Sequence, residues 1–143
     1  MTPQRITLIT LGVDNLARAR AFYEGWGWLV ASAQEGVVFF QMLGAALALF
    51  GRADLAADQG RPGAMLGTGA MTLAQNFATR AEVDAAFAGA LAAGAVALKA
   101  PQEVFWGGYS GYFADPDGHV WELAMNPFWP LADDGSLTLP DAG

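Results

Sequence analysis

The carboxylate of Glu122 is the side chain of this sequence with the clearest capacity for chemistry. Glu122 lies inside the mostly apolar stretch 119–125, between Trp121 and Leu123. If it faces a cleft, it can act as a general base or as a hydrogen-bonding anchor for a ligand. In the alternative interpretation, nearby backbone amides or an arginine satisfy the carboxylate and it has no chemical role.

Asp115, Asp117 and His119 lie just before Glu122 and have side chains that could act in catalysis. Their sequence context favours a structural role. Asp115 and Asp117 belong to the sequence Asp-Pro-Asp-Gly, which predicts a tight turn because Pro sets the first turn dihedral and Gly118 accepts a positive φ. An aspartate in such a turn usually bonds its own backbone. His119 follows the turn directly, so we expect a solvated hairpin residue rather than a catalyst.

A glycine-rich segment that leads into an expected strand carries four aromatic residues: Phe105, Trp106, Tyr109 and Tyr112. Aromatic rings in such a segment suit stacking on a flat, apolar ligand. We therefore expect these four to line a ligand-binding site, with Thr10 and Asn76 as further ligand-binding candidates on other strands. Trp121 should point away from Glu122 by strand alternation and pack against a helix.

Two features of the composition exclude whole classes of site. The 143 residues include no cysteine, which excludes a disulfide framework, a thiolate metal site and a cysteine nucleophile. They include one histidine, so a multi-histidine metal site is impossible within one chain. The length is that of one ordinary domain.

Charge and hydropathy argue against two kinds of partner. The net charge is −7, and the basic residues are scattered except for Arg18 and Arg20. Phosphate backbones and anionic membranes require clustered lysines and arginines, so we expect neither a nucleic acid nor a membrane partner. No apolar run approaches the roughly 18 residues of a membrane span. The N-terminal residues lack the pattern of a secretory signal, so a cytoplasmic protein is expected.

The first half of the chain predicts a strand, a helix and three more strands. β-branched and apolar residues predict a strand over 5–13, and Asp14 or Asn15 can cap the helix that follows. Further strands are expected at 28–33, 36–42 and 45–50. The glycine-rich segment 51–69 predicts a linker with at most one helical turn.

The second half repeats this order of elements. A strand over 71–78 precedes a capping box from Thr79 to Glu82, and Gly94 is a natural end for the helix. Strands are expected at 95–100, 109–114 and 119–125. The order predicts an α+β fold of two βαβββ modules whose curved sheets enclose a ligand cleft. The expected organisation is a single domain, 1–143, with modules at about 5–50 and 70–125, the linker 51–69 and a tail, 126–143.

Two stretches carry a family resemblance. LGVDNLARARAFYEGWGW and FADPDGHVWELAMNP resemble the vicinal oxygen chelate superfamily, which includes glyoxalase I, bleomycin-resistance proteins and extradiol dioxygenases. FWGGYSGYFADPDGHVWELAMNP also resembles a bacterial glyoxalase-like subgroup. The resemblance implies paired βαβββ modules, a homodimer, and in the metal-dependent enzymes a divalent ion held by first-strand and last-strand residues of both modules.

The ligand positions that the resemblance implies are mostly without donors in this chain. They fall on Leu8, on or beside Ala48, near Thr72 and on Glu122. A slip of three or four residues at the third position would place an amide there, which is a poor substitute for imidazole. A stable divalent site needs three or four protein donors. We therefore expect no metal ion and no other cofactor.

Three functions remain open at this point. The first is a metal-independent protein that binds a small apolar or aromatic molecule between its sheets, as in drug or metabolite sequestration; the acidic surface is compatible with a cationic compound. The second is a metal-free enzyme that uses Glu122 as acid or base on a carbonyl compound. The third is a metal-dependent glyoxalase-like lyase or dioxygenase whose ligands lie in another register.

Overall fold

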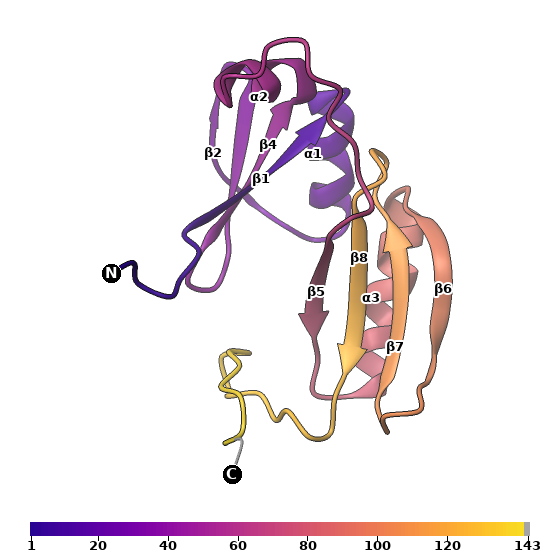
Figure 1. Ribbon diagram of the computed structural model, residues 1–143. Helices are drawn as coiled ribbons and strands as arrows, with labels where there is room; N and C mark the ends of the chain where they lie inside the picture. Colours follow the sequence, from indigo (N-terminus) through magenta and orange to yellow (C-terminus); the bar gives the residue numbers. More distant parts are fainter. Residues whose placement is uncertain (142–143) are drawn as a thin grey trace. The chain divides into compact units, whose positions relative to one another are not determined.

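Each half of the chain forms one four-stranded sheet with a helix packed on it in the computed structural model, which describes residues 1–141 (Figure 1). The first unit ends at Gly67 and the second begins at Thr68. The first contains β1 (Leu8–Val13), α1 (Leu16–Gly25), β2 (Val30–Gln34), β3 (Val37–Gln41), β4 (Ala46–Gly51) and α2 (Arg52–Asp58). The second contains β5 (Thr72–Asn76), α3 (Arg80–Ala93), β6 (Val96–Glu103), β7 (Tyr109–Ala114) and β8 (Val120–Met125).

The two sheets have the same topology. Their strand orders are β1-β4-β3-β2 and β5-β8-β7-β6. In each sheet the first and last strands of the unit pair in parallel, and the other neighbours are antiparallel. The predicted α+β fold of two βαβββ modules is therefore confirmed.

The helix ends follow the predicted capping chemistry. Of the two possible caps of α1, Asn15 is used, and its side chain accepts a hydrogen bond from the Arg18 amide at 3.0 Å. At α3 the Thr79 hydroxyl oxygen accepts from the Glu82 amide at 3.2 Å. Gly94 ends α3 with a φ of 119°, a left-handed conformation that favours glycine.

The segment after β4 corrects one expectation. We expected at most one helical turn there, but α2 runs over seven residues. Its first residue, Arg52, donates from Nε to the Gly12 carbonyl at 3.3 Å and pairs with Asp14 at 3.4 Å. Ala56 is fully buried. Contacts with β1 therefore stabilise a helix whose own apolar pattern is too short to predict it.

The core of the second unit lies between α3 and one face of its sheet. Val83, Phe87 and Ala90 of α3 are buried, as are Phe113 and Trp121 of the sheet. The rings of Phe113 and Trp121 stack at a centroid distance of 6.4 Å. The expectation that Trp121 packs toward the helix is confirmed, and alternation turns its neighbour Glu122 to the other face of the sheet. Among residues 1–141, no helix has the length and apolarity to cross a membrane.

Strand β6 runs unusually close to β7 at Gly111. The β6 register shifts on both sides of Lys99, and a Cβ on Gly111 would lie 2.8 Å from the Pro101 nitrogen and 2.9 Å from the Lys99 carbonyl oxygen. Both atoms belong to the backbone, so a side chain at position 111 would have to displace the strand itself.

We predict that Gly111→Ala lowers the free energy of unfolding by about 1–3 kcal/mol, because it overpacks the β6–β7 contact. Gly67→Ala is the matched control, since a Cβ there meets no atom within 4 Å, and it should change stability by less than about 0.5 kcal/mol. Urea denaturation of both variants measures the difference. Equal stability of the two would contradict the close approach.

Candidate functional site

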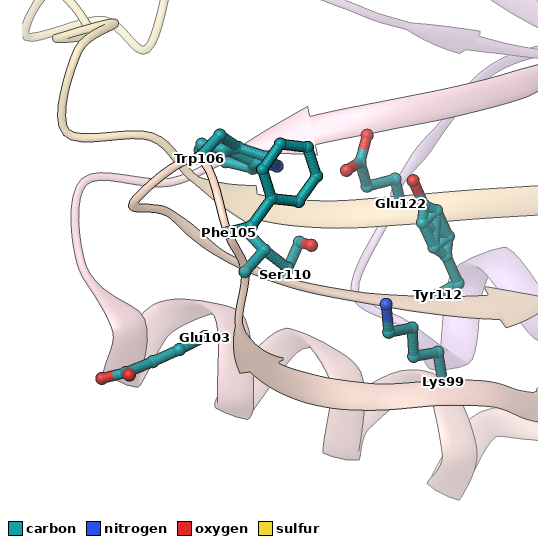
Figure 2. Close-up of a pocket in the computed structure, with 8 residues that line it drawn as sticks. Lys99, Glu103, Phe105, Trp106, Ser110, Tyr112 and Glu122 are labelled. Atoms are coloured by element: carbon teal, nitrogen blue, oxygen red, sulfur yellow. The ribbon is translucent and has the colours of Figure 1, made fainter.

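The face of the second sheet that points away from α3 carries a pocket of about 310 Å³ (Figure 2). Its volume is at the lower end of the range for small-molecule sites. The pocket lies entirely within the second unit, and we call it the second-sheet pocket. Its lining residues are Lys99, Glu103, Val104, Phe105, Trp106, Ser110, Tyr112 and Glu122.

Three polar side chains form a row across neighbouring strands of this pocket. Lys99 of β6 pairs with Tyr112 of β7, and Tyr112 pairs with Glu122 of β8. Directly opposed residues on one sheet face are close enough for their side chains to interact. Figure 2 shows the ammonium, phenol and carboxylate reaching into the same space. The row brings a cation, a hydrogen-bond donor and a carboxylate to one site.

The phenol of Tyr112 and the carboxylate of Glu122 lie beside each other on the pocket face of the sheet. Burial raises the pKa of Tyr112, and the negative charge of Glu122 and a hydrogen bond with its carboxylate raise this pKa further. All three effects disfavour the phenolate. Tyr112 therefore keeps its proton at neutral pH, beside the half-buried carboxylate of Glu122.

The aromatic side of the pocket comes from the tight loop between β6 and β7. The Gly107 amide donates to the Val104 carbonyl, and the Val104 amide donates to the Gly108 carbonyl, both at 3.0 Å. The Trp106 ring folds over Gly108 so closely that a Cβ there would lie 1.8 Å from it. Glycine at 108 is therefore required for the position of the indole. The Phe105 ring is fully exposed.

The structure places Tyr109 on the opposite side of the sheet from this pocket. Its hydroxyl donates to Asp84 of α3 at 2.6 Å, and the Arg80 guanidinium carbon lies 5.1 Å from its ring centroid. Arg80 also pairs with Glu103 at 2.8 Å. Figure 2 shows Glu103 pointing away from the pocket. These contacts join α3 to the base of the β6–β7 loop.

Of the four aromatic residues predicted to form one wall, the pocket lining therefore includes three: Phe105, Trp106 and Tyr112. Asn76 lies on the same sheet face as Glu122, but its partner in the sheet is Ala124, two residues beyond Glu122. Asn76 is not part of the pocket lining. Thr10 lies in β1 of the first unit.

Four lining residues were not predicted from the sequence: Lys99, Glu103, Val104 and Ser110. Two of them had a signal in the sequence. Lys99 is the single lysine of the chain, and it lies on the strand before Tyr112. Ser110 is buried and is two residues from Tyr112, so strand alternation places both on one face. A search for polar residues in phase with Tyr112 would have found Ser110.

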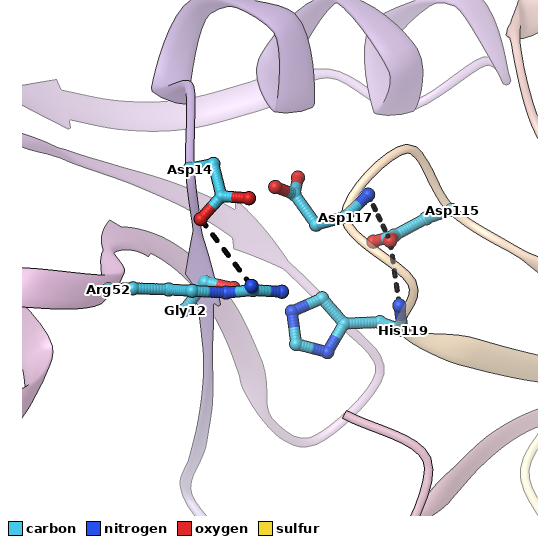
Figure 3. Close-up of polar contacts among 6 residues, drawn as sticks. All are labelled: Gly12, Asp14, Arg52, Asp115, Asp117 and His119. Carbon is cyan, nitrogen blue, oxygen red and sulfur yellow. Dashed lines mark hydrogen bonds and ion pairs between the residues drawn. The ribbon is translucent and has the colours of Figure 1, made fainter. Parts of the chain in front are cut away.

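The acidic turn after β7 is structural. Oδ1 of the buried Asp115 accepts hydrogen bonds from the Asp117 and His119 amides, each at 2.9 Å (Figure 3). This confirms the expectation that an aspartate of this turn bonds its own backbone. In the first unit, the same figure shows the ion pair of Arg52 with Asp14.

The donors present do not fit a divalent cation. Within residues 1–141, no three His, Asp or Glu side chains gather into a metal-binding group. In its sheet row, Glu122 has Ala74 on one side and Tyr112 on the other. A single carboxylate is too few for a site that needs three or four protein donors.

A second hollow, of about 560 Å³, lies in the first unit. Its lining residues are Gly27, Trp28, Leu29, Val30, Ala31, Phe40, Gln41, Met42 and Leu43. They include no ionisable side chain, so this hollow offers apolar surface but no acid, base or charge to orient a ligand. The second-sheet pocket is the better candidate for function.

Comparisons with known proteins agree with this fold. A family model described as the Glyoxalase/Bleomycin resistance protein/Dioxygenase superfamily matches residues 5–123. A glyoxalase-related enzyme from Fulvimarina pelagi is 38% identical, with a TM-score of 0.90, and the match covers 97% of this chain and 100% of that chain. A lactoylglutathione lyase from Agrobacterium tumefaciens is 26% identical, with a TM-score of 0.69 and coverage of 92% and 100%.

A more distant structure shows the same fold. A glyoxalase/bleomycin resistance protein/dioxygenase family enzyme from Burkholderia phytofirmans is 19% identical, with a TM-score of 0.73 and coverage of 83% and 96%. The comparison with curated proteins gave no match. From the family match and the 38% identical relative, we conclude that the chain belongs to the glyoxalase/bleomycin resistance protein/dioxygenase superfamily, the vicinal oxygen chelate proteins.

Proposed function

We propose that this protein binds a small, largely apolar or aromatic molecule in the second-sheet pocket, without a metal ion. The observation that carries the proposal is the composition of the lining, which places the rings of Phe105 and Trp106 beside the Tyr112–Glu122 pair. Small-molecule sites commonly combine apolar and aromatic walls with a few polar groups that orient the ligand.

The aromatic wall offers a stacking surface. Phe105 is fully exposed although it lines the pocket, so a bound ring would remove apolar surface from water. The Trp106 indole is held against Gly108, so little ordering of this side chain is required when a ligand stacks on it. Both properties favour a flat ligand.

The Tyr112–Glu122 pair supplies the polar anchor. The phenol of Tyr112 lies beside the Glu122 carboxylate in the same row of the sheet. A carboxylate has about four lone-pair sites, so acceptor capacity remains for a hydroxyl or N–H group of a ligand. This arrangement suits sequestration of a drug or metabolite, which needs shape and anchoring but no reaction. A homodimer and a cytoplasmic location stay predictions.

Catalysis through Glu122 is the second candidate. The neighbouring phenol of Tyr112 favours it, because a general base needs a partner that can orient it. Glu122 would take a proton from the carbon beside a bound carbonyl group and return it at another position. One structural relative is named a lactoylglutathione lyase and another carries a dioxygenase family name. A glyoxalase-like lyase reaction needs only this proton transfer. A dioxygenase-type reaction also needs molecular oxygen.

Loss of a ring from the aromatic wall should weaken ligand binding. Trp106→Ala should weaken the binding of indole, a neutral flat probe, by about threefold to tenfold, because one stacking partner is lost. Gly108→Ala should weaken it too, because it displaces the indole ring of Trp106 without removing it. NMR titration measures the affinities.

Trp129→Ala is the matched control for these variants, since Trp129 is a partly exposed tryptophan of the same unit outside the pocket lining. An equal loss of affinity in Trp129→Ala, or no loss in Trp106→Ala, would count against the proposed site.

Glu122→Gln distinguishes binding from catalysis. If the protein is a lyase, purified metal-free protein should form or consume S-lactoylglutathione, and Glu122→Gln should lose this turnover because the amide cannot accept the proton. Thioester absorbance follows the reaction. If the protein only binds, the unmodified protein shows no turnover and the second candidate is rejected.

The titration of Tyr112 tests the polar anchor. Its folded-state pKa lies above the ordinary value of about 10, so the unfolded chain loses this proton first as pH rises. The resulting contribution to stability is present below pH ~10 and disappears as pH passes through the folded-state pKa. Glu122→Gln should lower the pKa of Tyr112, although burial keeps it above the ordinary value.

Carbon NMR of the tyrosine Cζ atoms measures this pKa, with Tyr112→Phe to assign the signal. Tyr109 is the internal control, because the hydrogen bond to Asp84 is the main cause of its raised pKa, and Glu122→Gln should leave it unchanged. An unchanged Tyr112 titration in Glu122→Gln would refute the direct interaction.

A further inference from the structure

We infer that the second-sheet pocket selects aromatic molecules that carry an anionic group, such as a carboxylate, at one end and a hydroxyl or amino group at the other. Lys99 binds the anionic group, and Glu122 accepts a hydrogen bond from the opposite end. This inference rests on the proposed binding function and specifies its ligand class.

Lys99 is the cation of the pocket. Its ammonium points into the pocket beside Tyr112 (Figure 2), and within residues 1–141 no hydrogen bond or ion pair engages it. The other charged residues of the lining, Glu103 and Glu122, are acidic. The Glu103 carboxylate pairs with Arg80 at 2.8 Å. The Lys99 charge is thus available to a ligand.

The position of Lys99 depends on the irregular course of β6. Lys99 and Gln102, three residues apart, pair with Tyr112 and Ser110, which are two residues apart. Regular alternation would turn Lys99 and Gln102 to opposite faces of the sheet. The extra residue in β6 instead allows Lys99 to share a face with Tyr112 and Glu122. The close approach at Gly111 accommodates this course of the strand.

Lys99 and Glu122 lie on either side of Tyr112, on strands two positions apart. Adjacent strands are about 4.8 Å apart, so the two backbones are separated by roughly 10 Å. A single ligand therefore meets opposite charges at its two ends and the rings of Phe105 and Trp106 along its body. This geometry matches an elongated aromatic acid with a polar group at the far end.

The net charge of the chain, taken alone, favours cationic over anionic ligands. At −7, the overall field attracts cations and repels anions, and Glu122 alone would favour an amine. Selection of an anion therefore has to come from the local contact with Lys99. Because the global and local effects differ in sign, a comparison of matched ligands separates them.

The experiment compares three probes of one shape: para-hydroxycinnamate, its uncharged primary amide, and para-hydroxycinnamylamine. We expect the wild-type protein at neutral pH to bind the carboxylate about tenfold more tightly than the amide, since charge-assisted hydrogen bonds are roughly twice as strong as neutral ones. The amine should bind no better than the amide. Calorimetry or NMR titration gives the affinities.

Variants then assign the preference to Lys99. Lys99→Met keeps most of the aliphatic chain, and it should reduce carboxylate affinity to that of the amide while amide affinity stays unchanged. Lys99→Arg should keep the preference. Arg5→Met changes the net charge by the same amount outside the pocket, and it should leave all three affinities unchanged. Thermal unfolding checks that each variant is folded.

The outcomes separate this inference from the proposed function. Equal binding of the three probes, weakened by Trp106→Ala, would overturn the anion selectivity and leave the binding function standing. Tighter binding of the amine, or a carboxylate preference that persists in Lys99→Met, would also overturn it. Failure of all three probes to bind would count against both proposals.

Discussion

Side-chain alternation along β7 and β8 joins the stability of the second unit to its chemistry. Phe113 and Trp121 face α3 and form the buried stack that holds helix and sheet together. Their neighbours Tyr112 and Glu122 face the other side, where the pocket lies. A shift of one residue in register would exchange the two sets, placing a carboxylate in the core and a tryptophan in solvent. The burial of the core therefore holds the polar pair in place.

Close backbone approaches refine this arrangement, and two glycines make them possible. Gly111 lets β6 cross near β7 on its irregular course, and Lys99 reaches the pocket face from that strand. Gly108 lets the Trp106 ring lie close against the loop. In both places the neighbour lies closer to the added Cβ than van der Waals contact allows. The shape of the pocket therefore depends on the absence of a side chain at Gly108 and Gly111, as well as on the residues that line it.

The two units share a topology but differ in what their sheets carry. In the first unit, Tyr23, Trp28 and Phe40 form an aromatic cluster with ring centroids 5.0–5.9 Å apart, and the hollow beside it has no ionisable lining. The second unit carries the row of lysine, tyrosine and glutamate. Both units therefore retain the superfamily fold, and of these two hollows the one in the second unit has ionisable lining residues, in keeping with the rule that a fold does not fix a function.

The sequence by itself determined the repeated βαβββ order, the Thr79 cap of α3, the acidic turn and the opposite orientations of Trp121 and Glu122, and it left Asp14 and Asn15 as alternative caps of α1. These depend on local propensity and on a strict period of two or 3.6 residues, which neighbouring residues reveal. The tertiary structure decided the rest. Helix α2 forms because Arg52 reaches β1. Tyr109, by contrast, is three residues from Tyr112 in one strand, so alternation alone already places the two on opposite faces. Lys99 reaches Tyr112 because an irregular strand breaks the alternation, and such irregularities arise from contacts between strands that no local pattern records.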